Sequence, residues 1–172
     1  MSVARLTRAA VVMTAAALLS CGEPPLGPVP PPQADLIGSL LQATGLLQCS
    51  SLPYASATQT IGSAGGTIRV GPHTLTVPAG ALSSPVAITG ALVTGRGVNA
   101  VQFQPEGLRF QRSASLTMSY ANCNLIGLLL PKRIAYVSDG LDILSYLASI
   151  DNLFAKQVTG RVDHFSNYAV AW

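Results

Sequence analysis

Short runs in which apolar and polar residues alternate occupy the chain from about Ala57 onward. Within residues 115–120, for example, Leu116, Met118 and Tyr120 alternate with serine and threonine. A repeat of two places successive side chains on opposite faces of a β-strand, so one face of each run can be buried. The pattern predicts ten strands, over residues 58–61, 66–70, 74–77, 86–92, 100–103, 115–120, 133–137, 143–147, 157–162 and 168–172.

Glycine and proline separate these runs, in the turn sequences Ala64-Gly65-Gly66, Gly71-Pro72, Pro78-Ala79-Gly80, Pro105-Glu106-Gly107 and Ser138-Asp139-Gly140. Glycine favours turns because it tolerates positive φ, and proline because its φ is fixed. Many short strands joined by such turns are typical of an antiparallel β-sandwich, and no helical crossover that would indicate a parallel sheet is evident. We therefore predict an all-β antiparallel sandwich over residues 57–172.

Four ordered motifs span this predicted domain: Ala64-Gly65-Gly66-Thr67, Leu75-Thr76-Val77-Pro78-Ala79-Gly80-Ala81-Leu82, Gln104-Pro105-Glu106-Gly107-Leu108-Arg109-Phe110 and His164-Phe165-Ser166-Asn167-Tyr168. Together they resemble the ZU5 domain, a β-sandwich module of ankyrins and netrin receptors with bacterial surface relatives. The resemblance implies a sandwich fold and a role in protein–protein contact. The partner-binding residues of that family do not map onto this sequence.

An export signal is predicted over residues 1–20. Arg5 and Arg8 precede an apolar stretch over residues 9–19, which is too short to span a bilayer as a helix. Ser20 and Cys21 follow, and this junction resembles the lipobox of bacterial lipoproteins. The resemblance implies cleavage before Cys21 and acylation of that residue, with chains such as palmitate.

The same resemblance predicts the location of the chain. Gly22, rather than aspartate, follows the lipidated cysteine, which in enteric bacteria directs a lipoprotein to the outer membrane. We therefore expect a protein of the cell envelope that is held at the membrane by its lipid anchor. Whether it occupies the periplasmic or the surface face stays open.

Removal of the signal changes the charge of the chain. The full sequence has ten Lys+Arg against seven Asp+Glu, and loss of Arg5 and Arg8 leaves eight against seven. The remaining basic residues are scattered without interleaved aromatic rings, so no nucleic-acid partner is predicted. A chain that is 49% hydrophobic and only 10% charged is typical of an extracytoplasmic β-domain.

Between the lipidation site and the sandwich, two segments are expected. Residues 21–33 are expected to form a proline-rich tether, in which residues 23–33 predict semi-rigid polyproline II of roughly 34 Å. Residues 34–56 predict a short helical and linker segment, because the apolar residues of 34–47 have helical spacing and Gly45 would end the helix. The helix either packs on the domain, which we favour, or lies on a membrane or partner.

Cysteine number agrees with export. Lipidation of Cys21 would leave an even pair, Cys49 and Cys123, which could form a disulfide in an oxidising compartment. Closure of the loop between them would stabilise the fold by roughly 4–5 kcal/mol in the chain-entropy model. The alternative is two unpaired, buried thiols.

The sequence His164-Phe165-Ser166 suggests one possible reaction. Some ZU5-containing proteins cleave themselves between phenylalanine and serine in this sequence, so the resemblance implies that Ser166 could attack the Phe165 carbonyl while His164 takes the proton. In a strand, positions 164 and 166 would share a face, whereas Asp163 would point away. The alternative is structural: His164 and Ser166 bond to backbone at a bend, and Phe165 fills the core.

No cofactor or metal is predicted. His73 follows Gly71-Pro72 without a nearby acidic or thiol ligand, and Asp139, Asp142 and Asp151 fit no EF-hand spacing, although a low-affinity calcium site stays open. Trp172 is interpreted as a structural anchor of the sheet rather than a sugar-stacking ring. The prediction is thus a non-catalytic envelope lipoprotein with a ZU5-like interaction or structural module. Self-cleavage is the first alternative, and a glycan-binding sandwich is the weaker one.

Overall fold

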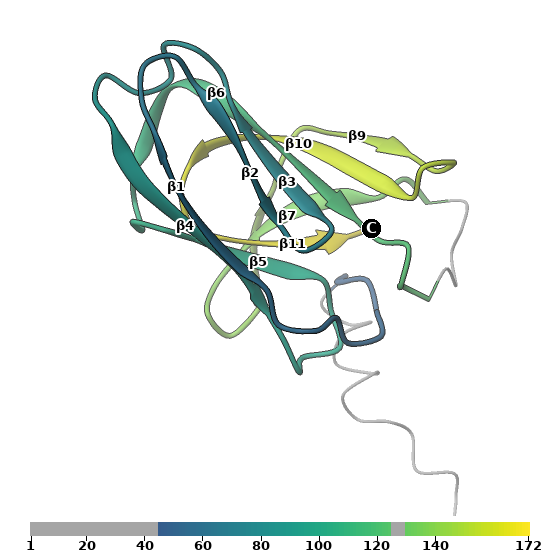
Figure 1. Ribbon diagram of the computed structural model, residues 1–172. Helices are drawn as coiled ribbons and strands as arrows, with labels where there is room; N and C mark the ends of the chain where they lie inside the picture. The colour runs from purple at the N-terminus through teal and green to yellow at the C-terminus, as the bar shows by residue number, and fades with distance from the viewer. Residues whose placement is uncertain (1–44, 125–129) are drawn as a thin grey trace, which may run out of the picture. The chain divides into compact units, whose positions relative to one another are not determined.

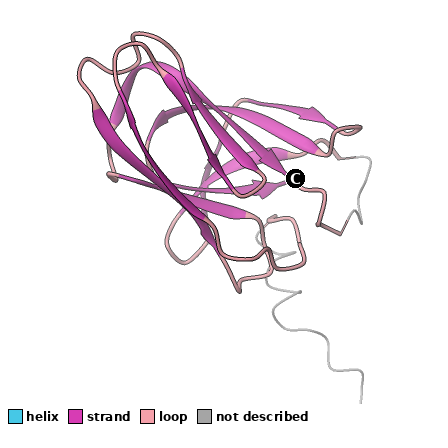
Figure 2. Cartoon of the chain, viewed as in Figure 1, coloured by secondary structure: helices cyan, strands magenta, loops and turns pink. Residues whose placement is uncertain are grey.

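The computed structural model describes residues 45–124 and 130–172, and every regular element in these ranges is a β-strand (Figure 2). The predicted signal, the tether, Cys21 and most of the predicted helix lie outside the described residues. The described end of the predicted helix, Gly45–Leu47, is not helical. Instead, Leu46 forms an isolated antiparallel bridge with Ala171.

Eleven strands follow one another along the chain. They are β1 (Ser56–Ile61), β2 (Gly66–Val70), β3 (His73–Val77), β4 (Val86–Val93), β5 (Ala100–Gln104), β6 (Arg109–Ser119), β7 (Arg133–Val137), β8 (Ile143–Tyr146), β9 (Ser149–Asn152), β10 (Gln157–His164) and β11 (Asn167–Ala171). Each of the ten predicted runs overlaps a strand, although β6 begins six residues before the run predicted from residue 115. Of the eleven strands in the described residues, only β9 was not predicted, because its sequence, Ser-Ile-Asp-Asn, contains a single apolar residue.

Hydrogen bonding groups these strands into two antiparallel sheets (Figure 1). The six-stranded sheet has the order β1-β4-β5-β11-β7-β8, and the five-stranded sheet has the order β2-β3-β6-β10-β9. The prediction of an all-β antiparallel sandwich is confirmed. Strands β1 and β2 lie at one edge of the two sheets, and β8 and β9 lie at the other.

The main core lies between the sheets and follows the alternation seen in the sequence. On β6, Leu116 and Met118 are fully buried, whereas Thr117 between them is partly exposed. They belong to the same buried cluster as Ile88, Phe103 and Val158, which come from strands of both sheets. Burial of such side chains stabilises the fold by roughly 1.5–3 kcal/mol each.

A second, smaller core lies on the outer face of the six-stranded sheet. Small residues of β5, β7 and β11, such as Ala100, Ala135 and Ala169, pack there with Leu46 and Leu141. The sheet is therefore buried on both faces at β11, and all five residues of that strand are buried. This explains why β11 lacks the apolar and polar alternation of β6.

One glycine allows the two sheets to approach closely. A Cβ atom on Gly90 of β4 would lie 2.5 Å from Val70 Cγ2 and 2.8 Å from Phe103 Cε1. Neither distance leaves room for a methyl group. Any larger residue at position 90 would therefore push β2 and β4 apart.

Candidate functional site

Cys49 and Cys123, the predicted disulfide pair, lie at bonding distance. Their Sγ atoms are 1.99 Å apart, and the two residues form an isolated antiparallel bridge. Both side chains are 9% exposed. The bridge attaches the segment that precedes β1 to the segment that follows β6, and so joins regions separated by 74 residues.

Two asparagines, which the sequence analysis did not identify, support this attachment. Asn122 donates through Nδ2 to the Ser50 carbonyl at 2.6 Å and to Asn99 Oδ1 at 3.0 Å. Asn99 donates through its own Nδ2 to Asn122 Oδ1 at 2.7 Å and to the Ser119 carbonyl at 2.8 Å. Asn99 is buried and Asn122 is partly buried, so loss of these bonds would leave the Asn99 amide unpaired in the interior, which is costly. Isolated asparagines carry no local sequence signal for such a pairing.

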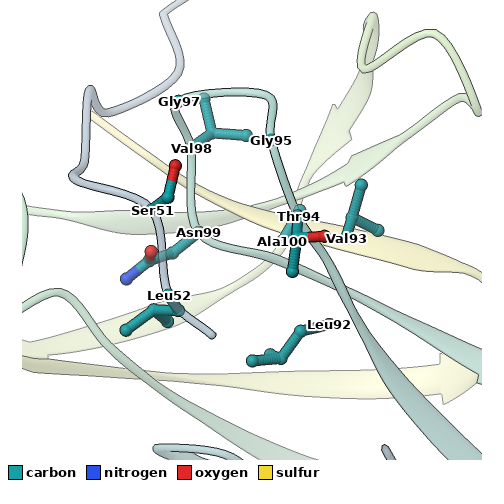
Figure 3. A pocket seen from close by; sticks show the side chains of 10 residues that line it. All are labelled: Ser51, Leu52, Leu92, Val93, Thr94, Gly95, Gly97, Val98, Asn99 and Ala100. Carbon is teal, nitrogen blue, oxygen red and sulfur yellow. The ribbon is translucent and has the colours of Figure 1, made fainter. Parts of the chain in front are cut away.

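Two hollows lie near this attachment, and neither is an enclosed pocket of ligand size. One is lined by residues on either side of the 93–97 turn and by Ser51 and Leu52 (Figure 3). Its volume is about 10 Å³, which is room for about one water molecule. The other is an open surface depression around Cys49, Asn122 and Cys123. Neither has the enclosed volume that a small-molecule site requires.

The His164-Phe165-Ser166 sequence occupies the crossing between the two sheets. Strand β10 of the five-stranded sheet ends at His164, and β11 of the six-stranded sheet begins at Asn167. The regular strand geometry that would place residues 164 and 166 on one face therefore does not extend to Ser166. Asp163 accepts a hydrogen bond from Ser113 Oγ at 2.5 Å rather than orienting His164.

The side chains of this sequence have separate surroundings. Phe165 is fully buried, with its ring stacked on Phe103 at 5.5 Å and edge-on to Phe110 at 4.9 Å. The His164 ring packs edge-on against Tyr136 at 5.1 Å. Ser166 is 6% exposed, and within the described residues no hydrogen bond joins it to His164.

The backbone of the crossing is tied on both sides. The Phe165 carbonyl accepts a hydrogen bond from the Gly107 amide at 3.0 Å, and the His164 carbonyl accepts one from Tyr168 Oη at 2.5 Å. Burial raises the pKa of the Tyr168 phenol, with smaller contributions from Tyr136 and Asp163. The phenol therefore stays protonated and keeps donating at any ordinary pH.

His73 is the first residue of β3, directly after the Gly71-Pro72 turn, and its side chain is 1% exposed. Its Nδ1 accepts a hydrogen bond from the Ser119 amide at 3.1 Å, while its Nε2 has no partner. Burial lowers the pKa of His73 to about 4. The imidazole is therefore neutral at neutral pH and sits inside the sandwich.

The three aspartates considered for calcium are engaged separately. Asp139 accepts from Asn167 Nδ2 at 2.7 Å, and Asp142 accepts from Ser138 Oγ at 3.0 Å. Asp151 accepts from Tyr120 Oη at 2.6 Å. In the part of the chain that the structure describes, no three histidine, cysteine or acidic residues gather as metal ligands.

Asp151 also has a structural role that the sequence did not indicate. Its carboxylate accepts hydrogen bonds from Tyr120 Oη and, at 2.9 Å, from the Lys132 backbone amide. The second bond joins β9 to the residue that precedes β7. Burial raises the pKa of the Tyr120 phenol, and the bond to Asp151 raises it further. From the sequence, Asp151 was considered only as a calcium ligand, because neither strand β9 nor the contact with Tyr120 was predicted.

No helix in the described ranges is long and apolar enough to cross a membrane. Comparison with known proteins finds no family model that matches the chain and no curated protein that matches it. The resemblance to ZU5 domains stays a prediction from the sequence motifs, because many unrelated families share a sandwich architecture.

Proposed function

We propose that this chain is a lipid-anchored protein of the cell envelope, in the outer membrane, whose sandwich acts as a non-catalytic interaction or structural module. The partition of the three cysteines carries the proposal. Cys49 and Cys123 have their sulfurs at bonding distance, and Cys21 follows a small residue at the end of an export signal. A bridged pair supports an oxidising compartment, and the remaining cysteine is the one that acylation requires.

The surroundings of the two histidines support a module without catalysis. His73 has a lowered pKa inside the core, and His164 packs between tyrosine rings with no bond to Ser166. A general base must reach the proton that it removes, at about 2.6–3.2 Å. These positions favour a structural role for both side chains.

Metabolic labelling with an alkyne fatty acid tests the anchor. The wild-type chain should incorporate the label and migrate as a processed form. Cys21→Ala should lose the label and accumulate as the uncleaved precursor, whereas the matched variant Cys49→Ser should keep it. Labelling that persists in Cys21→Ala would refute the lipid anchor.

Self-cleavage between Phe165 and Ser166 is the second proposal. The bond from the Gly107 amide to the Phe165 carbonyl favours it, because a backbone donor at the attacked carbonyl stabilises the developing oxyanion. The intact mass of the denatured protein is the test. A fragment that ends at Phe165 and disappears in Ser166→Ala would support cleavage, and full-length chain alone would eliminate it.

A further inference from the structure

Strand β1 is an edge of the six-stranded sheet, and one side of its backbone is unpaired. Its six residues pair with β4 in an uninterrupted antiparallel register. The Leu92 amide donates to the Ala55 carbonyl at 2.9 Å, so the backbone groups of Ala55 point toward β4. This direction alternates along an antiparallel strand, so the backbone groups of Ser56, Thr58 and Thr60 point away from β4. They meet no strand of the described residues, and β1 can therefore accept another strand.

Of the four edge strands in the described residues, β1 has the least protection against pairing. Strand β2 exposes Arg69, whereas β8 and β9 have only four residues each. Strand β1 has six residues, none of which is charged or proline, and no bulge interrupts its register. Charge, proline, bulges and short length are the usual means of protecting an edge. The hydroxyl side chains of β1 limit apolar aggregation, but they do not repel a matching strand.

The side chains of β1 separate into an inner and an outer face. Ala57 packs against the main core, so it lies on the inner face. Ser56, Thr58 and Thr60 are exposed and lie on the outer face. Thr58 Oγ1 already shares a hydrogen bond of 2.8 Å with Thr89 Oγ1 of β4. Cross-strand hydroxyl pairs of this kind stabilise a sheet, so the outer face is suited to a further strand that carries hydroxyls.

The neutrality of this edge favours a second copy of the chain as its partner. Residues 36–68 contain no Asp, Glu, Lys or Arg, and the neighbouring strand β4 contains none. When two identical strands pair, charges near the symmetry axis face charges of the same sign, so a strand that pairs with itself must be neutral there. Arg69 follows this stretch, but it lies between the buried residues Ile68 and Val70. Its side chain therefore points to the outer face of the five-stranded sheet and lies outside the β1 pairing.

We propose that β1 pairs antiparallel with β1 of a second copy, about a two-fold axis at Thr58. The axis places Thr58 opposite its own copy and Ser56 opposite Thr60, so hydroxyls meet hydroxyls along the outer face. On the inner face Ala57 lies opposite Gln59, and the small methyl group leaves room for the longer amide side chain. The two six-stranded sheets thereby become one continuous sheet. The pairing does not depend on the lipid anchor, because β1 belongs to the sandwich itself.

The residues on either side of β1 fit this register. Tyr54 is 69% exposed and would lie opposite Gly62 of the second copy, which has no side chain to obstruct the ring. A Cβ atom on Gly62 would lie 3.6 Å from Pro85 Cγ, so the ring meets an apolar surface there. Pro53 has no amide proton, and the pairing therefore ends before it.

Cysteine cross-linking in cells that express the full-length chain tests the pairing and its register. Thr58→Cys places two thiols opposite each other at a Cα separation of about 5.5 Å, which a disulfide can bridge. Ser56→Cys or Thr60→Cys alone separates identical positions by about 14 Å. We expect Thr58→Cys to form covalent dimers on mild oxidation, and the other two variants to do so only when they are co-expressed. The matched control is Ser145→Cys on the exposed edge strand β8, which should give no more dimer than wild type.

Charge at position 58 gives a second readout without new thiols. Two differently tagged copies should co-precipitate, and Thr58→Lys in both should reduce the yield several-fold, whereas Ser145→Lys in both should not. Combining Thr58→Lys with Thr58→Glu should restore the yield, although both variants lose the bond to Thr89. Equal dimer from Thr58→Cys and Ser145→Cys would overturn self-pairing. A covalent adduct of Thr58→Cys with a different protein, or opposite charges that fail to restore the yield, would also overturn it.

Discussion

The two edges of the sandwich both expose strands that could pair with another chain, but their side chains have opposite compositions. Strands β1 and β2 expose serine, threonine, glutamine and arginine, including Thr58, Gln59 and Arg69. Strands β8 and β9 expose Leu144, Tyr146 and Ile150. Both edges present unpaired backbone groups that could bind another chain, and polar or charged side chains are the usual protection.

The backbone of the β8 and β9 edge offers a different kind of protection. The strands there are short, with four residues each, and a register shift between Tyr136 and Val137 disturbs the pairing of β7 with β8. Such features limit edge-to-edge pairing without removing the apolar side chains. The β8 and β9 edge is therefore protected by its shape rather than by the polarity of its side chains.

The largest expected effect concerns the Cys49 and Cys123 pair, which attaches the segment that runs from Gly45, beside Tyr146 of β8, toward β1. Cys49→Ser should lower the free energy of unfolding by roughly 4–5 kcal/mol under oxidising conditions. Without the bridge the unfolded chain is no longer closed into a long loop, so its conformational entropy rises. Urea denaturation with and without reductant measures this. With reductant present, the variant and wild type should coincide, and an equal loss in both conditions would indicate lost packing instead.

On the side of the polar edge, acid should have the next largest effect. His73 of β3, which pairs with β2, has its folded pKa lowered from 6.5 to about 4. Between these values the unfolded chain binds more protons, so stability falls as pH falls and levels off below about pH 4. The loss contributed by His73 should reach about 3 kcal/mol.

Denaturation as a function of pH measures the contribution of His73. His73→Gln should flatten the dependence between pH 6.5 and 4 whatever its effect on stability at pH 7. A slope that is the same in wild type and His73→Gln would show that this imidazole is not responsible.

A smaller effect should follow from loosening β9. The Asp151 carboxylate accepts hydrogen bonds from Tyr120 Oη and from the Lys132 amide through its two oxygens. Asp151→Asn keeps only one acceptor oxygen, so one of these donors loses its partner. We expect a loss of about 1–3 kcal/mol, measured by urea denaturation. Asp163→Asn, which changes an exposed carboxylate bonded to Ser113, is the control, and an equal loss there would contradict a special role for Asp151.

Exchanging the character of the edges should have the smallest effect on stability. Ile150→Thr and Thr67→Ile replace exposed residues and should change the free energy of unfolding by no more than about 0.5 kcal/mol. Ile150→Thr should reduce concentration-dependent self-association in sedimentation velocity, and Thr67→Ile should increase it, because apolar edges aggregate. The comparison fails if both variants associate to the same extent as wild type.

The sequence predicted the strands well where the alternation was strong. Residues 115–120 of β6 were recognised because Leu116, Met118 and Tyr120 form a clear repeat of two. Strand β9 was missed because it pairs with β10 on one side only and needs little apolar surface of its own. The pair of Cys49 and Cys123 was predicted from the number of cysteines. The hydrogen-bonded pair of Asn99 and Asn122 beside it could not be predicted, because no sequence pattern indicates that two distant asparagines are in contact.

The sequence alone determined most of the strands and the class of fold, because alternation and turn residues act over a few neighbouring positions. The tertiary structure decided which strands became edges, and so which apolar side chains remained exposed. It also put His73 in the core and joined Asp151 to Tyr120. These outcomes depend on strand order and on contacts between distant residues, which a repeat of two does not encode.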